Sequence, residues 1–178
     1  MSAAATTAPR RAPWQGWVTL GARIILGVVL LIAGGLKIGN LEASVLAVRA
    51  YQLVPFELTR PLGYALPIVE IAVGLMLIAG VFTRVAALAG AGLMLAFIIG
   101  IASVWARGIS IDCGCFGGGG AVEASLTQYP LEIARDVGLL ACGLWAAWRP
   151  TAPWSIDTWL FAAPQPIPDH ELETEDVR

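Results

Sequence analysis

Four apolar stretches constrain this chain more than any other feature of its sequence. They run at about residues 18–36, 62–82, 84–105 and 131–148. A helix that crosses a bilayer needs roughly 20 consecutive, mostly apolar residues. Charged residues make up only 13% of the chain, whereas a soluble domain carries about 25%. The sequence therefore predicts an all-α integral membrane protein, a four-helix bundle of transmembrane spans with lipid as its outer surface.

The basic residues give the expected orientation in the membrane. They balance across the two sides, with Arg10, Arg11, Arg84 and Arg149 on one side and Lys37, Arg49, Arg60 and Arg107 on the other. The doublet Arg10 and Arg11 before the first span therefore decides the orientation. We expect residues 1–17 and the C-terminus to be cytoplasmic, and the connection at 107–129 to lie on the outer face. The first span is long for a signal peptide, and no A-x-A-like cleavage site follows before Lys37, so we expect it to be retained.

Two further segments have a distinct composition. Residues 40–60 combine apolar and polar positions, which predicts a short interfacial helix that ends at Pro55. Residues 149–178 are rich in proline and acids, so we expect a disordered tail. The net charge of −2 and the absence of a basic patch argue against nucleic acid as a partner.

The connection at 107–129 holds a pair of cysteines, Cys113 and Cys115, separated by one glycine. A disulfide at this spacing would be strained, and a strained, exposed disulfide exchanges readily. Thiol–disulfide exchange is therefore the first interpretation. A Cu(I) site suits paired thiolates, but the chain's one histidine, His170, lies in the tail. A flexible loop with incidental cysteines is the third interpretation, and the neighbouring Asp112 disfavours a second negative charge.

A third cysteine, Cys142, lies inside the fourth span and shares a helix face with Arg135, seven residues earlier. A buried free cysteine packs well as a small apolar side chain. Alternatively, Cys142 is a relay thiol between the loop pair and an electron carrier in the membrane.

An acidic residue, Glu70, lies in the middle of the second span, three residues after Pro67. An ionisable group at that depth costs several kcal/mol unless it is paired or neutral, so it indicates a function. We expect Glu70 to pair with Arg135, which has Asp136 beside it, and Arg23 is the alternative partner. The pair is either a structural link between helices or a device for handling protons. Small residues at helical spacing, such as Gly27, Gly34 and Gly74, predict close helix packing.

These motifs, in this order, resemble those of the DoxX-like superfamily of four-helix membrane proteins, within it the MauE methylamine-utilisation branch. The resemblance covers about residues 20–148. The matching stretches are Arg23, Leu26-Gly27, Ala33-Gly34-Gly35-Leu36-Lys37, residues 48–55, Leu66-Pro67-Ile68-Val69-Glu70, Gly74, Gly80, Asp112-Cys113-Gly114-Cys115-Phe116-Gly117 and Arg135-Asp136.

The resemblance implies a redox-associated protein of the bacterial inner membrane, a thiol–disulfide oxidoreductase component in the maturation of methylamine dehydrogenase. Cys113 and Cys115 would exchange with a thioredoxin-like or DsbA-like extracytoplasmic partner, and a quinone would be the electron carrier. Fold-level similarity does not establish a substrate. A non-enzymatic scaffold or assembly subunit therefore remains an alternative, as does a copper-binding membrane protein, and the sequence leaves a homo-oligomer open.

Overall fold

The computed structural model describes residues 13–115, 118–123, 127–149, 152 and 154–157. In this part of the chain almost all regular structure is helical. The helices are α1 (Pro13–Ile38), α2 (Leu41–Ala50), α3 (Phe56–Ala79), α4 (Thr83–Ala106) and α5 (Tyr129–Trp148). Two short strands, β1 (Ile111–Asp112) and β2 (Gly120–Ala121), form an antiparallel ladder. The all-α fold is confirmed.

Three of the long helices are apolar enough to cross a membrane, namely Trp14–Ile38, Phe56–Ala79 and Thr83–Ala106. Helix α5 has a similar length of 20 residues, but Glu132, Arg135 and Asp136 lie in its first two turns. The chain is an α-helical membrane protein, and the crossing of the bilayer by α5 stays a prediction. Helix α3 begins six residues before the predicted span, because polar residues such as Glu57 and Arg60 masked its first turns.

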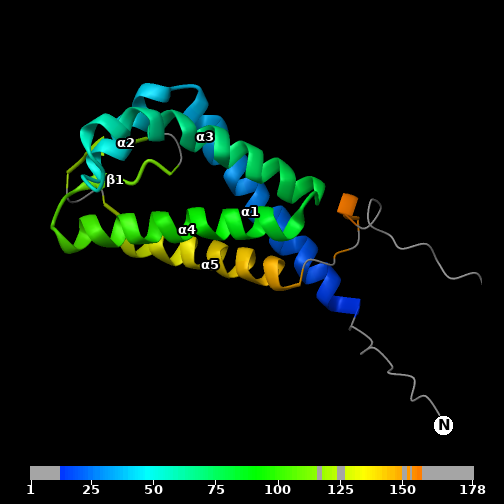
Figure 1. Cartoon of the computed structure of the whole chain (residues 1–178). Coiled ribbons are helices and arrows are strands. Elements are labelled where there is room, and N and C mark those ends of the chain that lie inside the picture. The colour runs from blue at the N-terminus through cyan, green and yellow to red at the C-terminus, as the bar shows by residue number, and fades with distance from the viewer. Residues whose placement is uncertain (1–12, 116–117, 124–126, 150–151, 153, 158–178) are drawn as a thin grey trace, which may run out of the picture.

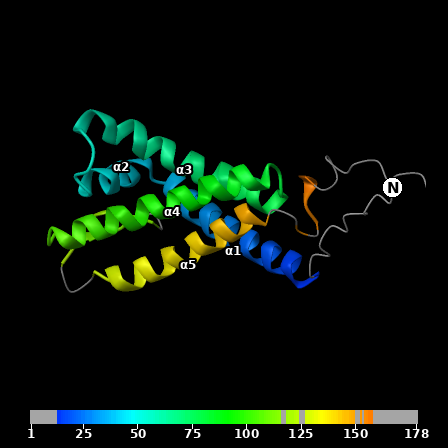
Figure 2. The same cartoon turned by 60° about the horizontal axis from the view of Figure 1, so that its bottom comes forward.

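The four long helices run side by side in a bundle whose two ends differ (Figure 1). Helix α1 packs along α3, α4 packs along α5, and α1 also contacts α5. Figure 2 shows the same pairs from a second direction. Helix α2 and the β1–β2 ladder lie at one end of the bundle. The start of α1, the end of α5 and the turn between α3 and α4 lie at the other.

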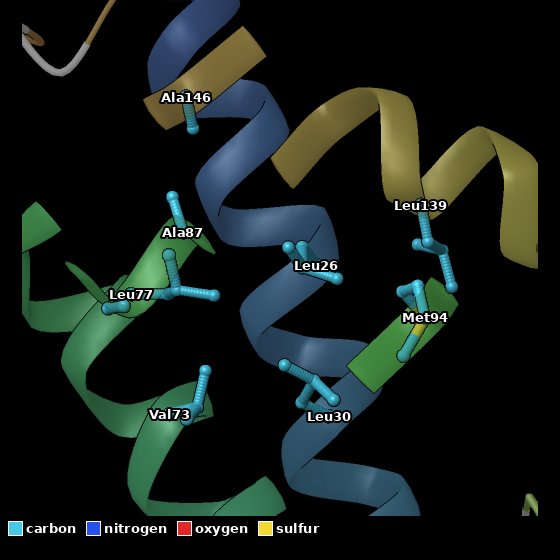
Figure 3. Close-up of a cluster of buried hydrophobic side chains, with 9 residues drawn as sticks. Leu26, Leu30, Val73, Leu77, Ala87, Met94, Leu139 and Ala146 are labelled. Carbon is cyan, nitrogen blue, oxygen red and sulfur yellow. The ribbon is translucent and has the colours of Figure 1, made fainter. Parts of the chain in front are cut away.

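The centre of the bundle is an apolar core to which all four long helices contribute (Figure 3). Leu26 and Leu30 of α1 are fully buried there. The other labelled members are Val73 and Leu77 from α3, Ala87 and Met94 from α4, and Leu139 and Ala146 from α5. The outward faces are apolar as well, with exposed residues such as Ile25, Leu75, Leu88 and Leu144. Apolar residues on both faces suit lipid surroundings.

The segment that follows α5 returns to the turn between α3 and α4. The Asp157 carboxylate accepts hydrogen bonds from the backbone N–H groups of Phe82 and Thr83, both at 2.8 Å, and so caps α4. The Ser155 hydroxyl donates to the carbonyl oxygen of Gly80 at 2.9 Å. The expectation of a disordered tail from residue 149 is therefore wrong for these residues, because their side chains satisfy backbone groups of the turn. The rest of the predicted tail and residues 1–12 lie outside the described residues.

A short helix within residues 40–60 is confirmed as α2, but it ends at Ala50 and not at the predicted Pro55. The Asn40 side chain accepts a hydrogen bond from the backbone N–H of Ala43 at 3.1 Å, which caps its N-terminus. Helix α2 packs on α3, where a Cβ at Gly63 would lie 2.7 Å from the Cα of Val45. This close contact holds α2 over the end of the bundle.

Candidate functional site

The cysteine pair follows β1 directly and is buried beneath α2. Only 8% of Cys113 and 5% of Cys115 is exposed. The backbone of Gly114 has φ +66, and a Cβ there would lie 2.6 Å from the Cβ of Ala47 on α2. The expectation of an exposed pair is therefore wrong. The glycine between the cysteines lets the backbone approach α2 closely. Both cysteines belong to a buried cluster with Ile101, Val104 and Tyr129.

The loop is held in place by two tyrosine hydroxyls. Tyr51 donates to the carbonyl oxygen of Cys113 at 2.8 Å. The hydroxyl of Tyr129 accepts from the backbone N–H of Ile111 and donates to the carbonyl of Ile109, both at 2.8 Å. The sequence analysis missed both tyrosines, because their partners are backbone groups far away along the chain. These three hydrogen bonds hold the backbone of residues 109–113, and so they fix where the Cys113–Cys115 segment begins.

The two thiols are free and differ in their surroundings. The backbone N–H of Cys115 points to the sulfur of Cys113 at 3.5 Å. Hydrogen bonding from Cys115 lowers the pKa of the Cys113 thiol, although burial and the nearby Glu132 carboxylate act in the opposite direction. The hydrogen bond with Cys113, together with burial, raises the pKa of the Cys115 thiol. Cys113 is therefore the thiol that ionises more readily.

The buried acid Glu70 pairs with Lys37 and not with Arg135. The distance from Lys37 Nζ to Glu70 Oε1 is 2.6 Å, and the side chains are 2% and 0% exposed. Arg135 instead contacts its neighbour Asp136 at 2.9 Å. The predicted Glu70–Arg135 pair is wrong, because α1 packs along α3 and the Lys37 side chain, in the last turn of α1, reaches inward. Hydropathy put Lys37 just beyond the span predicted at 18–36, among the basic residues of the outer side.

The charged groups nevertheless gather beside the cysteines. Glu70, Arg135, Asp136 and Cys115 line one enclosed cavity of about 10 Å³, together with apolar residues such as Phe97. That volume is close to the lower limit for a single water molecule. Three of the candidate residues from the sequence thus meet at one place, although Glu70 and Arg135 do not pair there.

A second and larger cavity borders Cys113. It measures about 350 Å³ and is lined mainly by apolar residues of α2, α3 and α4, such as Val48, Leu66 and Ala96. Cys113 and Lys37 also line it. Volumes of roughly 300–1,000 Å³ with few polar groups are typical of small-molecule sites. Cys113 therefore faces a space that a small apolar molecule can enter.

The third cysteine, Cys142, lines neither of these two cavities. It is six residues beyond Asp136, so it lies about 9 Å farther along α5. The relay role of Cys142 stays a prediction. Among the described residues there is no group of three or more His, Cys, Asp or Glu side chains that could hold a metal ion.

A model of the family described as "Methylamine utilisation protein MauE" matches residues 15–149. The chain belongs to the MauE family. The curated MauE protein of Methylorubrum extorquens is 36% identical over 138 residues, which are 76% of this chain and 72% of that protein. The MauE protein of Paracoccus denitrificans is 34% identical over 106 residues, 59% of this chain and 57% of that protein. No solved structure matches.

Proposed function

We propose that this MauE-family membrane protein carries out thiol–disulfide exchange through Cys113 and Cys115, in methylamine utilisation. The observation that carries the proposal is the geometry of the pair. Two free thiols lie one residue apart, and the N–H of the second points to the sulfur of the first at 3.5 Å. A donor at this position stabilises a thiolate, which is the form that attacks a disulfide.

The exchange passes through a mixed disulfide. One thiolate of the pair attacks a disulfide of the partner, and the second thiol then closes the Cys113–Cys115 bond and releases the partner in its reduced form. The reverse sequence oxidises a partner dithiol. The partner that we propose is a thioredoxin-like extracytoplasmic protein, and the cysteine loop would lie on the outer face of the inner membrane. A protein partner reaches the sulfurs only after the loop moves away from Ala47, since both are covered in the closed form.

Replacing either Cys113 or Cys115 with serine is expected to abolish methylamine-dependent growth in a methylamine-utilising bacterium whose own MauE gene is deleted. Cells are acid-quenched, denatured and treated with a thiol-reactive mass tag, with and without reduction. In part of the wild-type protein the pair should be a disulfide. These molecules should gain two further tags only after reduction. Growth of both serine variants at the wild-type rate would contradict the redox role and favour a scaffold.

The side of the membrane is tested with single added cysteines in the same cells. Glu123 lies exposed in the cysteine loop, and Trp14 lies exposed at the opposite end of the bundle. Glu123→Cys should react with a membrane-impermeant maleimide in intact cells, and Trp14→Cys only after the cells are opened. The opposite pattern would place the loop in the cytoplasm.

The larger cavity favours a second candidate, oxidation of the pair by a membrane quinone. Its apolar lining suits a quinone ring, and Lys37 offers a donor to a carbonyl oxygen. A bound quinone would accept the two electrons and two protons that the dithiol releases when Cys113 and Cys115 form a disulfide. This chain's residues would enclose the ring and hold Cys113 beside it.

Filling the cavity tests this candidate. Ala96→Trp is expected to slow disulfide formation by added decylubiquinone in the purified protein by about tenfold or more, because the indole occupies space next to the ring site. Ala102→Trp, at an exposed position on the same helix α4, is the matched control and should behave like the wild type. Equal rates in the two variants would exclude this cavity as the quinone site.

A further inference from the structure

Three carboxyl groups around the cysteine pair each have a buried oxygen with no hydrogen-bond partner among the described residues. These atoms are Glu70 Oε2, Glu132 Oε2 and Asp136 Oδ2. The ion pairs with Lys37 and Arg135 use the other oxygen of Glu70 and of Asp136. An unpaired polar atom in apolar surroundings is costly, and ionisable groups kept inside a membrane protein commonly handle protons.

Two of these acids are placed in sequence along α5. Glu132 and Asp136 are four residues apart, so they lie on one helix face, about 6 Å from each other along the axis. Glu132 is in the first turn of α5, at the end of the bundle that carries the loop, and it lies close enough to Cys113 to affect its charge. Asp136 is one turn deeper and lines the small cavity together with Cys115.

The other elements packed around the pair contribute few groups that titrate. Among the described residues they are Lys37 from α1, Tyr51 just after α2, Glu70 from α3, Asp112 from β1, and Tyr129 and Arg135 from α5. Helix α4 contributes only Met94 and Phe97 to the small cavity. Among them Glu70 is held by Lys37 at 2.6 Å. The charges that act on Cys115 are those of Cys113, Asp136 and Arg135. Asp136 is therefore the carboxyl group best placed to exchange a proton with this thiol.

The two sulfurs also have different access. Cys113 lines the larger cavity, from which a disulfide or another small oxidant can approach it. Of these two cavities Cys115 lines the small one, which has room for about one water molecule and has Glu70 and Asp136 in its wall. The two thiols of the pair therefore border two different cavities.

We propose that Cys113 is the attacking thiol, that Cys115 is the resolving thiol, and that Asp136 accepts the Cys115 proton, which Glu132 passes to the end of the bundle. This inference rests on the proposed thiol–disulfide exchange and assigns its roles. Glu70 is a positioning residue, which holds Lys37 and completes the wall of the small cavity.

The steps balance as follows when a partner disulfide is reduced. The Cys113 thiolate attacks one partner sulfur, the partner's S–S bond breaks, and the other partner sulfur leaves as a thiolate. Cys115 gives its proton to Asp136 and attacks the Cys113 sulfur, and the second partner sulfur leaves as a thiolate. The partner has then gained two electrons, and the chain holds the Cys113–Cys115 disulfide. The proton leaves by way of Glu132, and the reverse reaction uses the same route.

The test uses the purified full-length chain carrying Cys142→Ser, so that only the pair reacts, and 4,4′-dithiodipyridine as the disulfide. The first thiopyridone released reports attack, and the second reports closure of the Cys113–Cys115 bond. Cys115→Ser should release one equivalent and keep a mixed disulfide at Cys113, which mass spectrometry locates. Cys113→Ser should lack the fast first release. A mixed disulfide trapped mainly at Cys115 in the wild-type pair would overturn the assignment.

The proton route is tested on the second release. Asp136→Asn should leave the first release within about twofold of the wild type and slow the second about 100-fold, the size of a typical general-base contribution. The remaining rate should rise about tenfold per pH unit, because hydroxide then removes the proton. Glu132→Gln should slow the second release by a smaller factor, and it should not slow the first, because loss of the Glu132 charge favours the Cys113 thiolate. The matched control is Glu123→Gln, an exposed acid in the loop, which should change neither.

Rescue separates chemistry from folding. Asp136→Glu keeps a carboxyl group and should restore much of the closure rate. If Asp136→Asn does not fold, the second release is measured in Glu132→Gln instead. Closure at the wild-type rate in both Asp136→Asn and Glu132→Gln would overturn the proton route and leave thiol–disulfide exchange intact. Failure of the wild-type pair to release a second equivalent would instead overturn the proposed function itself.

Discussion

Replacing Glu70 with alanine is expected to destabilise the folded bundle by about 3–5 kcal/mol, because Lys37 then remains as a buried and unpaired charge. The pair is almost completely shielded, with side-chain exposures of 2% for Lys37 and 0% for Glu70 and a contact of 2.6 Å. The measurement is reversible unfolding in mixed detergent micelles, followed by tryptophan fluorescence. The double variant Lys37→Met with Glu70→Leu should recover most of the loss, since it removes both charges together.

The control for this prediction is the exposed pair Glu42 and Arg60, which are 69% and 71% exposed and 3.8 Å apart. Glu42→Ala should cost only a small part of what Glu70→Ala costs, because water screens exposed charges. Similar losses in the two variants would show that Glu70 is accessible to water. The double variant also separates a structural role of Glu70 from a chemical one. Its stability should recover, although the wall of the cavity beside Cys115 has lost the Glu70 carboxylate.

Replacing Gly74 with leucine is expected to force α1 and α3 apart and to destabilise the protein by about 3 kcal/mol. A Cβ at Gly74 would lie 2.8 Å from the carbonyl oxygen of Gly27 and 3.1 Å from the backbone N of Leu31. These are backbone atoms of α1, so no side-chain rotation relieves the clash. Close approach of this kind replaces the hydrophobic effect in holding membrane helices together.

Gly92→Leu is the matched control for the packing prediction. Gly92 lies on α4, where a Cβ would meet nothing within 4 Å. The control should unfold at the same detergent fraction as the wild type, or at a higher one, because glycine is a poor helix former. If Gly74→Leu behaved like Gly92→Leu, the contact between α1 and α3 would be looser than the distances indicate.

The helices could be predicted from the sequence, because a bilayer imposes their length and composition. Helices α1, α4 and α5 each contain a predicted span. Helix α3 instead ends at Ala79, three residues before the end of its predicted span, because Gly80 adopts a left-handed conformation there. Helix α3 begins with residues 56–61, which include Glu57, Arg60 and Pro61. These residues lower the mean hydropathy, so the predicted span began only after them. Close packing at Gly27 and Gly74 could also be predicted, because small residues recur at helical spacing along both helices.

The site could be predicted only in part, because its decisive contacts are tertiary. The sequence identified Cys115, Glu70 and Arg135, which meet around one cavity. It did not show that Lys37 turns inward, since the same residue at a helix end is equally compatible with the membrane surface. The cysteine loop packs against Ala47, a small residue in another helix whose position follows from the contact between α2 and α3.

The return of the chain after α5 has a mechanical consequence. At that end Asp157 holds the first turn of α4, Ser155 holds the turn before it, and Arg23 of α1 donates to the carbonyl oxygen of Leu77 at 2.9 Å. Residues of α1 and of the segment after α5 thus pin the α3–α4 hairpin at one end, and the cysteine loop lies at the other. At the loop end, the contacts that an opening has to break are the hydrogen bonds of Tyr51 and Tyr129 and the packing of Gly114 on Ala47. Any opening that uncovers the sulfurs should therefore start at the loop and leave the pinned end in place.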